Sequence, residues 1–386
     1  MVFPILRILT FGAFLAMAGA SPSRAADSQD IDALAASLGR GFVARPAHVG
    51  LSIGIVAPGK WRQFHFGSID RLHPVAPTGQ TIYELASLTK SYTGMLLAKA
   101  VVDGKVALDD DVRQYLPSAY RNLSFDGQPI RIVDLASHTS GLPKNLPAFA
   151  AGATPRQLLR QQGTVSRATF LHALAQVRLK VRPGTAFAYS NAGAQLVGIV
   201  LERAYGISYD ALLRRAITAP QHMPDTGTVV APRDAARTAR RYDGHGRAMP
   251  ELTFWRSLPA AGFLKSTIDD QLRYLAWNLD ASDRAVALAH RVVFRGTDER
   301  GDDIGLFWFV NRTRDGMRLV RHAGGSFGTT SFELLYPDAG IGVVLLANDA
   351  DASTEQALCR MADALADALA HPPLRQSAAW NGAGSR

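Results

Sequence analysis

A serine and a lysine three residues apart are the first pair in this sequence whose types and spacing could do chemistry. Ser87 and Lys90 lie in the stretch ELASLTKSYTG, residues 84–94, where an apolar helical pattern begins. Because residues i and i+3 of a helix share a face, the lysine amine can reach the serine hydroxyl. A serine becomes nucleophilic when a base takes its proton, and a lysine can be that base when burial or nearby cations lower its pKa. The pair therefore predicts an activated serine.

Two later stretches carry groups that could assist such a serine. Tyr189 and Asn191 lie at the start of a predicted helix, after a Pro-Gly turn. The tyrosine hydroxyl can relay or accept a proton if cations depress its pKa, and the asparagine amide offers both a donor and an acceptor. His322, Gly324 and Gly325 lie on a predicted strand, where glycine would let a substrate backbone approach the strand edge closely.

These stretches together resemble a known set of motifs. In order and spacing they are similar to the three motifs of the serine β-lactamase and penicillin-binding protein superfamily, namely Ser87-Leu88-Thr89-Lys90, Tyr189-Ser190-Asn191 and His322-Ala323-Gly324. The branch that they resemble is the class C β-lactamase-like one, which includes DD-carboxypeptidases, endopeptidases and lactamase-like esterases. Two further stretches are similar to that branch, SHTSGLP (137–143) and GFLKSTIDD (262–270).

The resemblance implies a role for each matching residue of the first two motifs. Ser87 would be the residue that is acylated. Lys90 and Tyr189 would share the proton transfers, and the resemblance leaves open which of them is the general base. Asn191 would hold the substrate amide and Lys90. No cofactor is expected, and no metal either, because the ten histidines form no H-E-x-x-H motif or comparable cluster.

The third motif would complete the site, and it also departs from the usual pattern. The backbone N–H groups of Ser87 and Gly325 would form an oxyanion hole, and the strand through Gly324 would pair with the substrate backbone. The motif usually begins with Lys and continues with Thr, whereas this sequence has His322 and Ala323. Because the imidazole of His322 is mostly neutral at pH 7, this position would carry less positive charge than the usual lysine, and a substrate carboxylate would be held less strongly. This disfavours efficient β-lactam hydrolysis.

The residues and the resemblance lead to one expected function. We expect a serine hydrolase that works through an acyl-enzyme, with peptidoglycan peptides that end in D-alanyl-D-alanine as the favoured substrate. A β-lactam or a small carboxylic ester is the alternative substrate. A non-catalytic module that binds penicillin or peptidoglycan is a second interpretation, because a fold alone does not establish catalysis, although nothing in the motifs is broken outright.

A different nucleophile is also possible on sequence grounds. The stretch GGSFG, residues 324–328, fits the G-x-S-x-G elbow of α/β-hydrolases, with Ser326 as its serine. That elbow needs a helix after the serine, whereas the following TTSFELLY alternates like a strand. Its triad would also need a downstream histidine, and His371 lies beside two prolines in the tail.

The order of the predicted elements sets the fold class. Strand patterns occur at 50–69, 305–310, 317–323, 329–336 and 340–348, and helical patterns fill most of the residues between. The helix that begins at Ser87 is expected to be amphipathic, and the last helix to be capped by Ser353. The stretch 130–143 predicts a helix that stops at Ser140, with His138 satisfying its end. Because two strands cannot form a stable sheet alone, we expect the first pair to join the later strands. The prediction is an α/β (α+β) fold: an antiparallel sheet flanked by helices, with an all-helical subdomain inserted at roughly 105–260 and a cleft between the two.

The two ends of the chain carry separate predictions. Residues 1–25 combine an early arginine, an apolar run and small residues, which is typical of a secretory signal peptide; an uncleaved anchor is the alternative. The protein would then be exported to the periplasm. The hydrolase domain would cover residues 27–370, and residues 371–386 would be a disordered tail.

Composition excludes several classes of partner. The net charge is +9, but the basic residues are dispersed with no run of five, so nucleic-acid binding is not expected. After the N-terminal segment, no stretch reaches the about 18 uninterrupted apolar residues of a membrane helix, so no stable membrane span is expected. The expected partner is therefore the substrate, a peptidoglycan peptide or a small amide, ester or β-lactam.

Overall fold

The computed structural model describes residues 28–117, 120–150, 152–163, 165–250, 257–296, 301–351 and 353–371. The predicted signal peptide, residues 1–25, lies outside the described residues, and so does the predicted tail apart from residue 371.

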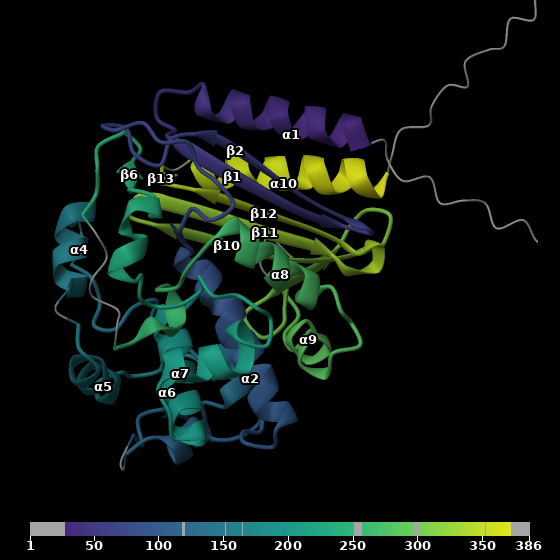
Figure 1. Ribbon diagram of the computed structural model, residues 1–386. Coiled ribbons are helices and arrows are strands. Elements are labelled where there is room, and N and C mark those ends of the chain that lie inside the picture. Colours follow the sequence, from purple (N-terminus) through teal and green to yellow (C-terminus); the bar gives the residue numbers. More distant parts are fainter. Residues whose placement is uncertain are drawn as a thin grey trace, which may run out of the picture.

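An antiparallel sheet forms the centre of the fold, as predicted (Figure 1). Within the described residues it has seven strands in the order β2-β1-β12-β11-β10-β9-β8. The bounds are β1 Gly50–Ala57, β2 Lys60–Gly67, β8 Asp303–Ile304, β9 Phe309–Arg312, β10 Arg318–Ser326, β11 Thr329–Tyr336 and β12 Ile341–Ala347. The first hairpin joins the later strands through β1 and β12, with Leu51 opposite Ala347. The two ends of the chain therefore build one sheet.

Helices cover both faces of this sheet. Helices α1 (Ser28–Val43) and α10 (Thr354–Ala370) run side by side along one face, as Figure 1 shows. They bury one set of strand residues, which includes Leu51, Ile53 and Leu345. Helix α8 (Ile268–Asn278) packs on β1 and β12 from the other face. Because side chains alternate along a strand and both faces are covered, β1 and β12 are buried along their whole length and carry no polar side chain except Ser52.

Helix α2 (Thr89–Val102) follows Ser87 and is buried on nearly all sides. Eleven of its fourteen residues are buried, so the predicted amphipathic pattern is wrong. The polar residues on its outer side find partners inside the fold: Thr93 donates to the carbonyl of Ala260 at 2.7 Å. Gly94 lets the chain pass closely, since a Cβ there would lie 2.0 Å from the Leu306 carbonyl oxygen. The helix is thereby fixed in the interior of the molecule.

The segment 105–260 is mainly helical. It contains α3 Ile132–Ala136, α4 Pro155–Gly163, α5 Arg167–Ala175, α6 Asn191–Tyr205 and α7 Tyr209–Leu213, and a π-helical turn follows at Arg214–Thr218. It also contains the short strands β4 Ser124–Phe125, β5 Gln128–Pro129 and β6 Tyr242–Asp243, so it is not all-helical. Strand β6 pairs with β13 (Asp349–Ala350), directly after the main sheet. An independent subdomain with these bounds stays a prediction.

The remaining elements are short. They are β3 Tyr83–Glu84, β7 Lys265–Ser266 and α9 Arg284–Ala289, together with 3-10 turns at Ala86–Leu88, Val112–Tyr115, Pro232–Arg237, Pro259–Ala261 and Pro337–Ala339. Strands β3 and β7 pair with each other, with Tyr83 opposite Ser266.

Three local predictions differ from the structure. The strand predicted at 305–310 begins only at Phe309, because Phe307 has a φ of +62° and the preceding residues form a turn. The helix predicted to reach Ser140 ends at Ala136. The predicted cap of the last helix is wrong, since Ser353 makes no capping bond and the Asp351 carboxylate accepts from the backbone N–H of Thr354 instead.

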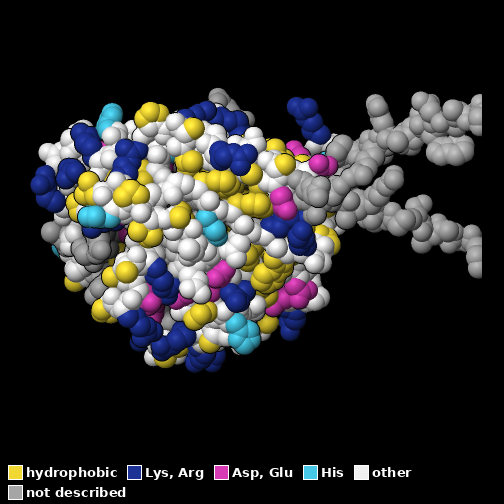
Figure 2. Space-filling model, turned by 45° about the horizontal axis from the view of Figure 1, so that its top comes forward, with side chains coloured by type: hydrophobic (Ala, Val, Ile, Leu, Met, Phe, Trp, Pro, Cys, Tyr) yellow, Lys and Arg dark blue, Asp and Glu magenta, His cyan; other side chains and the backbone are white. Residues whose placement is uncertain are grey.

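The distribution of surface charge and the length of the helices bear on binding to nucleic acids and membranes. On the face in Figure 2, Lys and Arg side chains are spread out with acidic side chains among them. No helix of the described ranges has both the length and the apolar character needed to cross a bilayer.

Candidate active site

Ser87 lies in a strained turn directly before α2. The turn is the 3-10 segment Ala86–Leu88, and Ala86 has a φ of +47°, a left-handed conformation that residues other than glycine rarely adopt. Such outliers persist only where surrounding contacts fix them, and they occur often at active sites. Two hydrogen bonds hold Leu85, the residue before Ala86. The Leu85 N–H donates to the carbonyl of Leu264 at 2.9 Å, and the Ser331 hydroxyl donates to the carbonyl of Leu85 at 2.7 Å.

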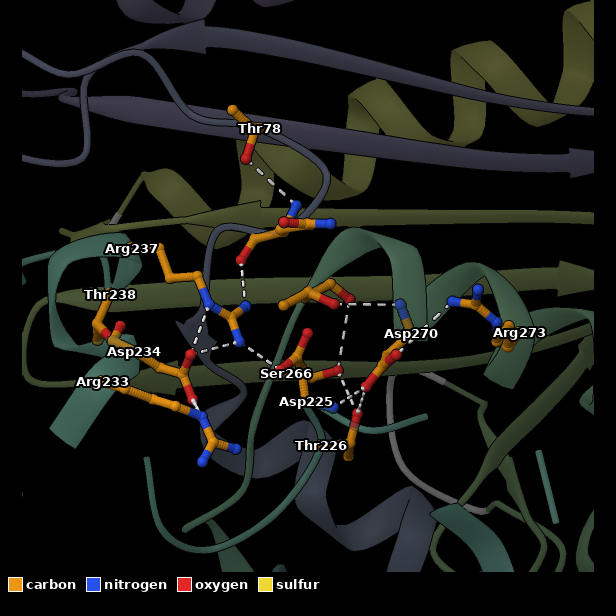
Figure 3. A network of polar contacts seen from close by, with 12 residues as sticks. Thr78, Asp225, Thr226, Arg233, Asp234, Arg237, Thr238, Ser266, Asp270 and Arg273 are labelled. Atoms are coloured by element: carbon orange, nitrogen blue, oxygen red, sulfur yellow. Dashed lines mark hydrogen bonds and ion pairs between the residues drawn. The ribbon is translucent and has the colours of Figure 1, made fainter. Parts of the chain in front are cut away.

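A polar network behind this turn anchors β7 (Figure 3). Thr226, Ser266 and Asp270 point toward one another, with Thr226 Oγ1 at 2.7 Å from Ser266 Oγ and at 2.8 Å from Asp270 Oδ2. Burial raises the pKa of Asp270 to about 6, although the Thr226 hydroxyl counteracts this. Because Leu264 directly precedes β7, the network fixes the carbonyl that receives Leu85.

The Lys90 side chain lies fully buried beside the serine. Its Nζ is 3.1 Å from Ser87 Oγ and donates to the carbonyl of Ala261 at 2.5 Å. Burial, and secondarily the charge of Lys144, hold the pKa of the Lys90 amine well below its usual range. A neutral amine has a free lone pair, so Lys90 can accept the proton of Ser87.

Tyr189 completes the group around the serine. Its hydroxyl is within hydrogen-bonding reach of Ser87, and its ring centroid is 4.9 Å from Lys90 Nζ. Burial raises the pKa of Tyr189 above its usual range, and the Glu355 carboxylate adds to this. Cations therefore do not depress the pKa of Tyr189, which was the condition for it to accept a proton. Tyr189 is a neutral phenol that can donate or relay a proton.

Asn191 is the first residue of α6. The Ser190 hydroxyl caps that helix by accepting from the Gly193 N–H at 2.9 Å. Asn191 Nδ2 donates to Asn145 Oδ1 at 2.8 Å, and the buried Asn191 Oδ1 has no partner among the described residues. The expected contact with Lys90 is not formed, because the lysine amine donates to Ala261. The free oxygen of Asn191 can accept from a ligand N–H.

The strand edge next to the serine is open where the third motif lies. Strand β9 pairs with β10 only as far as Arg321, whereas β11 pairs with β10 as far as Ser326. Gly325 is exposed on this edge, and a Cβ there would meet only Glu355 Oε2, at 3.7 Å. The edge can therefore receive an extended substrate backbone.

Gly324 allows a close approach between two parts of the backbone. A Cβ at this position would lie 2.4 Å from the Leu85 carbonyl oxygen and 2.9 Å from the Leu88 backbone nitrogen. The glycine therefore lets β10 pack directly against the turn that carries Ser87, and pairing of this strand with a substrate backbone stays a prediction.

His322 is buried and neutral. Its Nδ1–H donates to the carbonyl of Ala323 at 2.7 Å, and its Nε2 has no partner in the described part of the chain. Burial, and secondarily the charge of Lys90, lower the pKa of His322 to about 3. His322 therefore carries no positive charge at pH 7 and cannot replace the usual lysine as an anchor for a carboxylate.

A cavity of about 580 Å³ is lined by residues of β3, β7 and the segment 228–249, and none of Ser87, Lys90, Tyr189 and Asn191 lines it. Its lining includes Glu84, three residues before Ser87, together with Phe263, Lys265 and Arg241. The Arg241 guanidinium pairs with the Glu84 carboxylate at 3.2 Å. The cavity is large enough for part of a small peptide or ester.

The elbow interpretation is contradicted by the structure. Ser326 ends β10, and Thr329 begins β11, so the stretch is a β-hairpin and not a strand-to-helix turn. Gly328, with a φ of +107°, makes the turn possible. His371 pairs with Asp315 at 3.3 Å. In the described ranges, no group of three or more His, Cys, Asp or Glu side chains could hold a metal ion.

Sequence reasoning missed several residues of the site. The Ala261 carbonyl and the Ser331 hydroxyl are brought in by tertiary packing, and no local pattern announces them. His138 lies against Tyr189, with ring centroids 4.5 Å apart. The SHTSGLP stretch was a signal for it, but the residue was interpreted as satisfying a helix end.

A serine beside a buried amine and a phenol, between an antiparallel sheet and a helical layer, is the arrangement of a serine hydrolase. The model of the family described as Beta-lactamase matches residues 35–368. The chain therefore belongs to the β-lactamase family.

Individual relatives support this membership. The chain is 28% identical to protein flp of Staphylococcus aureus (strain N315) over 310 residues, which cover 78% of this chain and 59% of flp. It is 27% identical to the D-alanyl-D-alanine-carboxypeptidase/endopeptidase AmpH of Escherichia coli (strain K12) over 308 residues, 76% of this chain and 77% of AmpH. The chain thus spans little more than half the length of flp.

A solved structure shares the fold. The β-lactamase/D-alanine carboxypeptidase from Yersinia pestis, complexed with citrate, superposes with a TM-score of 0.77 and 23% identity. The superposition covers 89% of this chain and 99% of that one.

Proposed function

We propose that this protein is an exported serine hydrolase that acts as a D-alanyl-D-alanine carboxypeptidase/endopeptidase on peptidoglycan peptides. The observation that carries the proposal is the fully buried Lys90 amine, 3.1 Å from Ser87 Oγ. Such an amine can activate a serine without a cofactor. The similarity to AmpH supports the substrate class, and the pattern of residues 1–25 supports export.

The reaction follows from the positions of these groups. Lys90 takes the proton of Ser87 as Oγ attacks the substrate carbonyl. The backbone N–H groups of Ser87 and Gly325 stabilise the oxyanion, and losing one such donor typically costs about 2.7–4 kcal/mol. Tyr189 passes a proton to the leaving amine as the carbon–nitrogen bond breaks, and Lys90 returns a proton to Tyr189. Water then hydrolyses the acyl-enzyme by the same proton transfers in reverse roles.

The residues around the serine also bear on the choice of substrate. The substrate amide N–H would donate to Asn191 Oδ1, and its backbone would pair with the open edge at Gly325. His322 is neutral, which argues against β-lactam hydrolysis as the main activity. A carboxylic ester is the second candidate, because an ester needs no anchor for a carboxylate.

Labelling of the serine tests the proposal. We expect a fluorescent penicillin and a fluorophosphonate to label the wild-type protein, Ser87→Ala to abolish the labelling, and the matched Ser326→Ala to leave it intact. Mass spectrometry after incubation with muropeptides should show loss of D-alanine and the adduct on Ser87. A wild-type protein that takes neither label and leaves muropeptides unchanged would favour the non-catalytic interpretation.

A further inference from the structure

His138 has a conformation that its place after a short helix does not require. It lies two residues beyond the end of α3 and has a φ of +59°, which is unusual for a residue with a ring. Its side chain is almost completely buried. A strained, buried histidine persists only when specific contacts hold it.

Those contacts lie on both sides of Tyr189. The His138 carbonyl accepts from the Ala188 N–H at 2.7 Å, and His138 Nδ1 accepts from the Ser190 N–H at 3.2 Å. The imidazole ring also packs on the ring of Tyr189, at 4.5 Å between centroids. One residue therefore fixes the backbone before and after the tyrosine and supports its ring.

The hydrogen bonds also define the tautomer of His138. Because a backbone N–H donates to Nδ1, the proton of the neutral ring is on Nε2. That Nε2 is buried and has no partner among the described residues. Burial holds the pKa of His138 well below its usual range, and the neighbouring basic groups Lys90 and His322 add to this because each disfavours a second positive charge. The ring is therefore uncharged, so it adds no positive charge beside Lys90.

Resting on the function proposed above, we propose that His138 is a positioning residue that holds the Tyr189 hydroxyl against Ser87. It does so through its carbonyl, its Nδ1 and its ring, without touching the substrate. The left-handed conformation is the geometry that lets one residue present all three groups to the segment 188–190.

Two substitutions separate these contributions. His138→Gly keeps the left-handed backbone and removes Nδ1 and the ring. His138→Asn also tolerates that backbone, and its Oδ1 can accept from the Ser190 N–H in place of Nδ1. The matched control is His222→Gly, since His222 also has a positive φ, of +54°, but is exposed.

The measurement is ester hydrolysis by the purified full-length protein, with kcat and KM determined separately. We expect His138→Gly to lower kcat about 10- to 100-fold, because an active-site group misplaced by about 1 Å can cost that much. KM should stay within about threefold, His138→Asn should recover most of the loss, and His222→Gly should leave kcat unchanged. Thermal unfolding of each variant checks that the fold is intact.

A double-mutant cycle identifies the route of the effect. In a Tyr189→Phe background, His138→Gly should lower kcat further by less than about threefold, because the two residues act as a unit. If His138→Gly lowers kcat in that background as much as in the wild type, His138 acts independently of Tyr189. If His138→Asn has the same kcat as His138→Gly, the hydrogen bond to Nδ1 has no role. Either result overturns the inference about His138. The proposed function stands as long as the wild-type protein is labelled at Ser87, and failure of that labelling would overturn both the proposed function and the inference about His138.

Discussion

Gly324 offers a sharp test of how closely β10 must pack on the serine turn. In Gly324→Ala the new Cβ would lie 2.3 Å from Ser331 Oγ and 2.4 Å from the Leu85 carbonyl oxygen. Since ordinary contacts begin near 3.4 Å, β10 and the turn must separate by about 1 Å. The Ser331 hydroxyl can rotate away from the new Cβ, but the Leu85 carbonyl belongs to the backbone and cannot.

The separation moves the two proposed oxyanion donors apart. Gly325 follows directly on the strand and shifts with Gly324, while Ser87 stays on the turn. A misplacement of about 1 Å can cost about 10²-fold in rate, and the loss of one oxyanion donor costs about 10²–10³-fold in kcat. We therefore expect Gly324→Ala to lower kcat by about 10²- to 10³-fold. The crowding itself should cost about 1–3 kcal/mol of stability, which lowers Tm by about 1–4 °C, because a larger chain shifts less per kcal/mol than a domain of about 150–250 residues.

The assay compares Gly324→Ala with Gly325→Ala. The second alanine meets only Glu355 Oε2, at the ordinary distance of 3.7 Å, so its loss of kcat should be at least tenfold smaller. Ester hydrolysis and the rate of penicillin labelling give kcat and acylation, and thermal unfolding gives stability. A folded Gly324→Ala protein with wild-type acylation, or equal losses in both variants, would refute the reasoning.

Two further predictions concern buried and exposed carboxylates. Burial raises the pKa of Glu333 from 4.5 to about 8, so the folded state holds a proton that the unfolded state releases. The free energy of unfolding of the wild type should therefore fall as pH rises between these values, by up to about 5 kcal/mol at about 1.4 kcal/mol per pH unit. Urea unfolding at several pH values should show a weaker pH dependence of stability for Glu333→Gln. An equal pH dependence in both proteins would contradict this. Glu355 lies beside Gly325 at the open strand edge, so Glu355→Gln should lower KM about fivefold for substrates with a free carboxylate and leave uncharged esters unaffected. An equal change for both substrate types would exclude a charge effect.

The sequence was sufficient for features that depend on local pattern. The hairpin around Pro58, the helix that begins at Asn191 and the hairpin from Thr329 have nearly the predicted bounds. The closeness of Ser87 and Lys90 was also predictable, because it depends on helical spacing alone. The architecture followed from one physical argument, that an isolated strand pair needs partners.

Features that depend on tertiary contacts were not predictable in this way. Helix α2 was expected to have a polar face, but its Lys90 and Thr93 side chains reach carbonyls 171 and 167 positions away. His138 could be placed at a helix end, yet its contacts lie about 50 positions later in the chain. The role of Gly324 depends on a close approach between two backbones, which composition and periodicity do not report.

The long separation between the serine turn and its supports has a consequence for protein synthesis. The Ser331 hydroxyl holds the Leu85 carbonyl from 246 positions further along the chain. A nascent chain that ends before β11 has Ser87, Lys90 and β10, but it lacks the Ser331 hydroxyl and the strand that pairs with β10. Hydrolytic competence should thus appear only after β11 has been synthesised, and fragments that stop before it should be inert even when their first helices have formed.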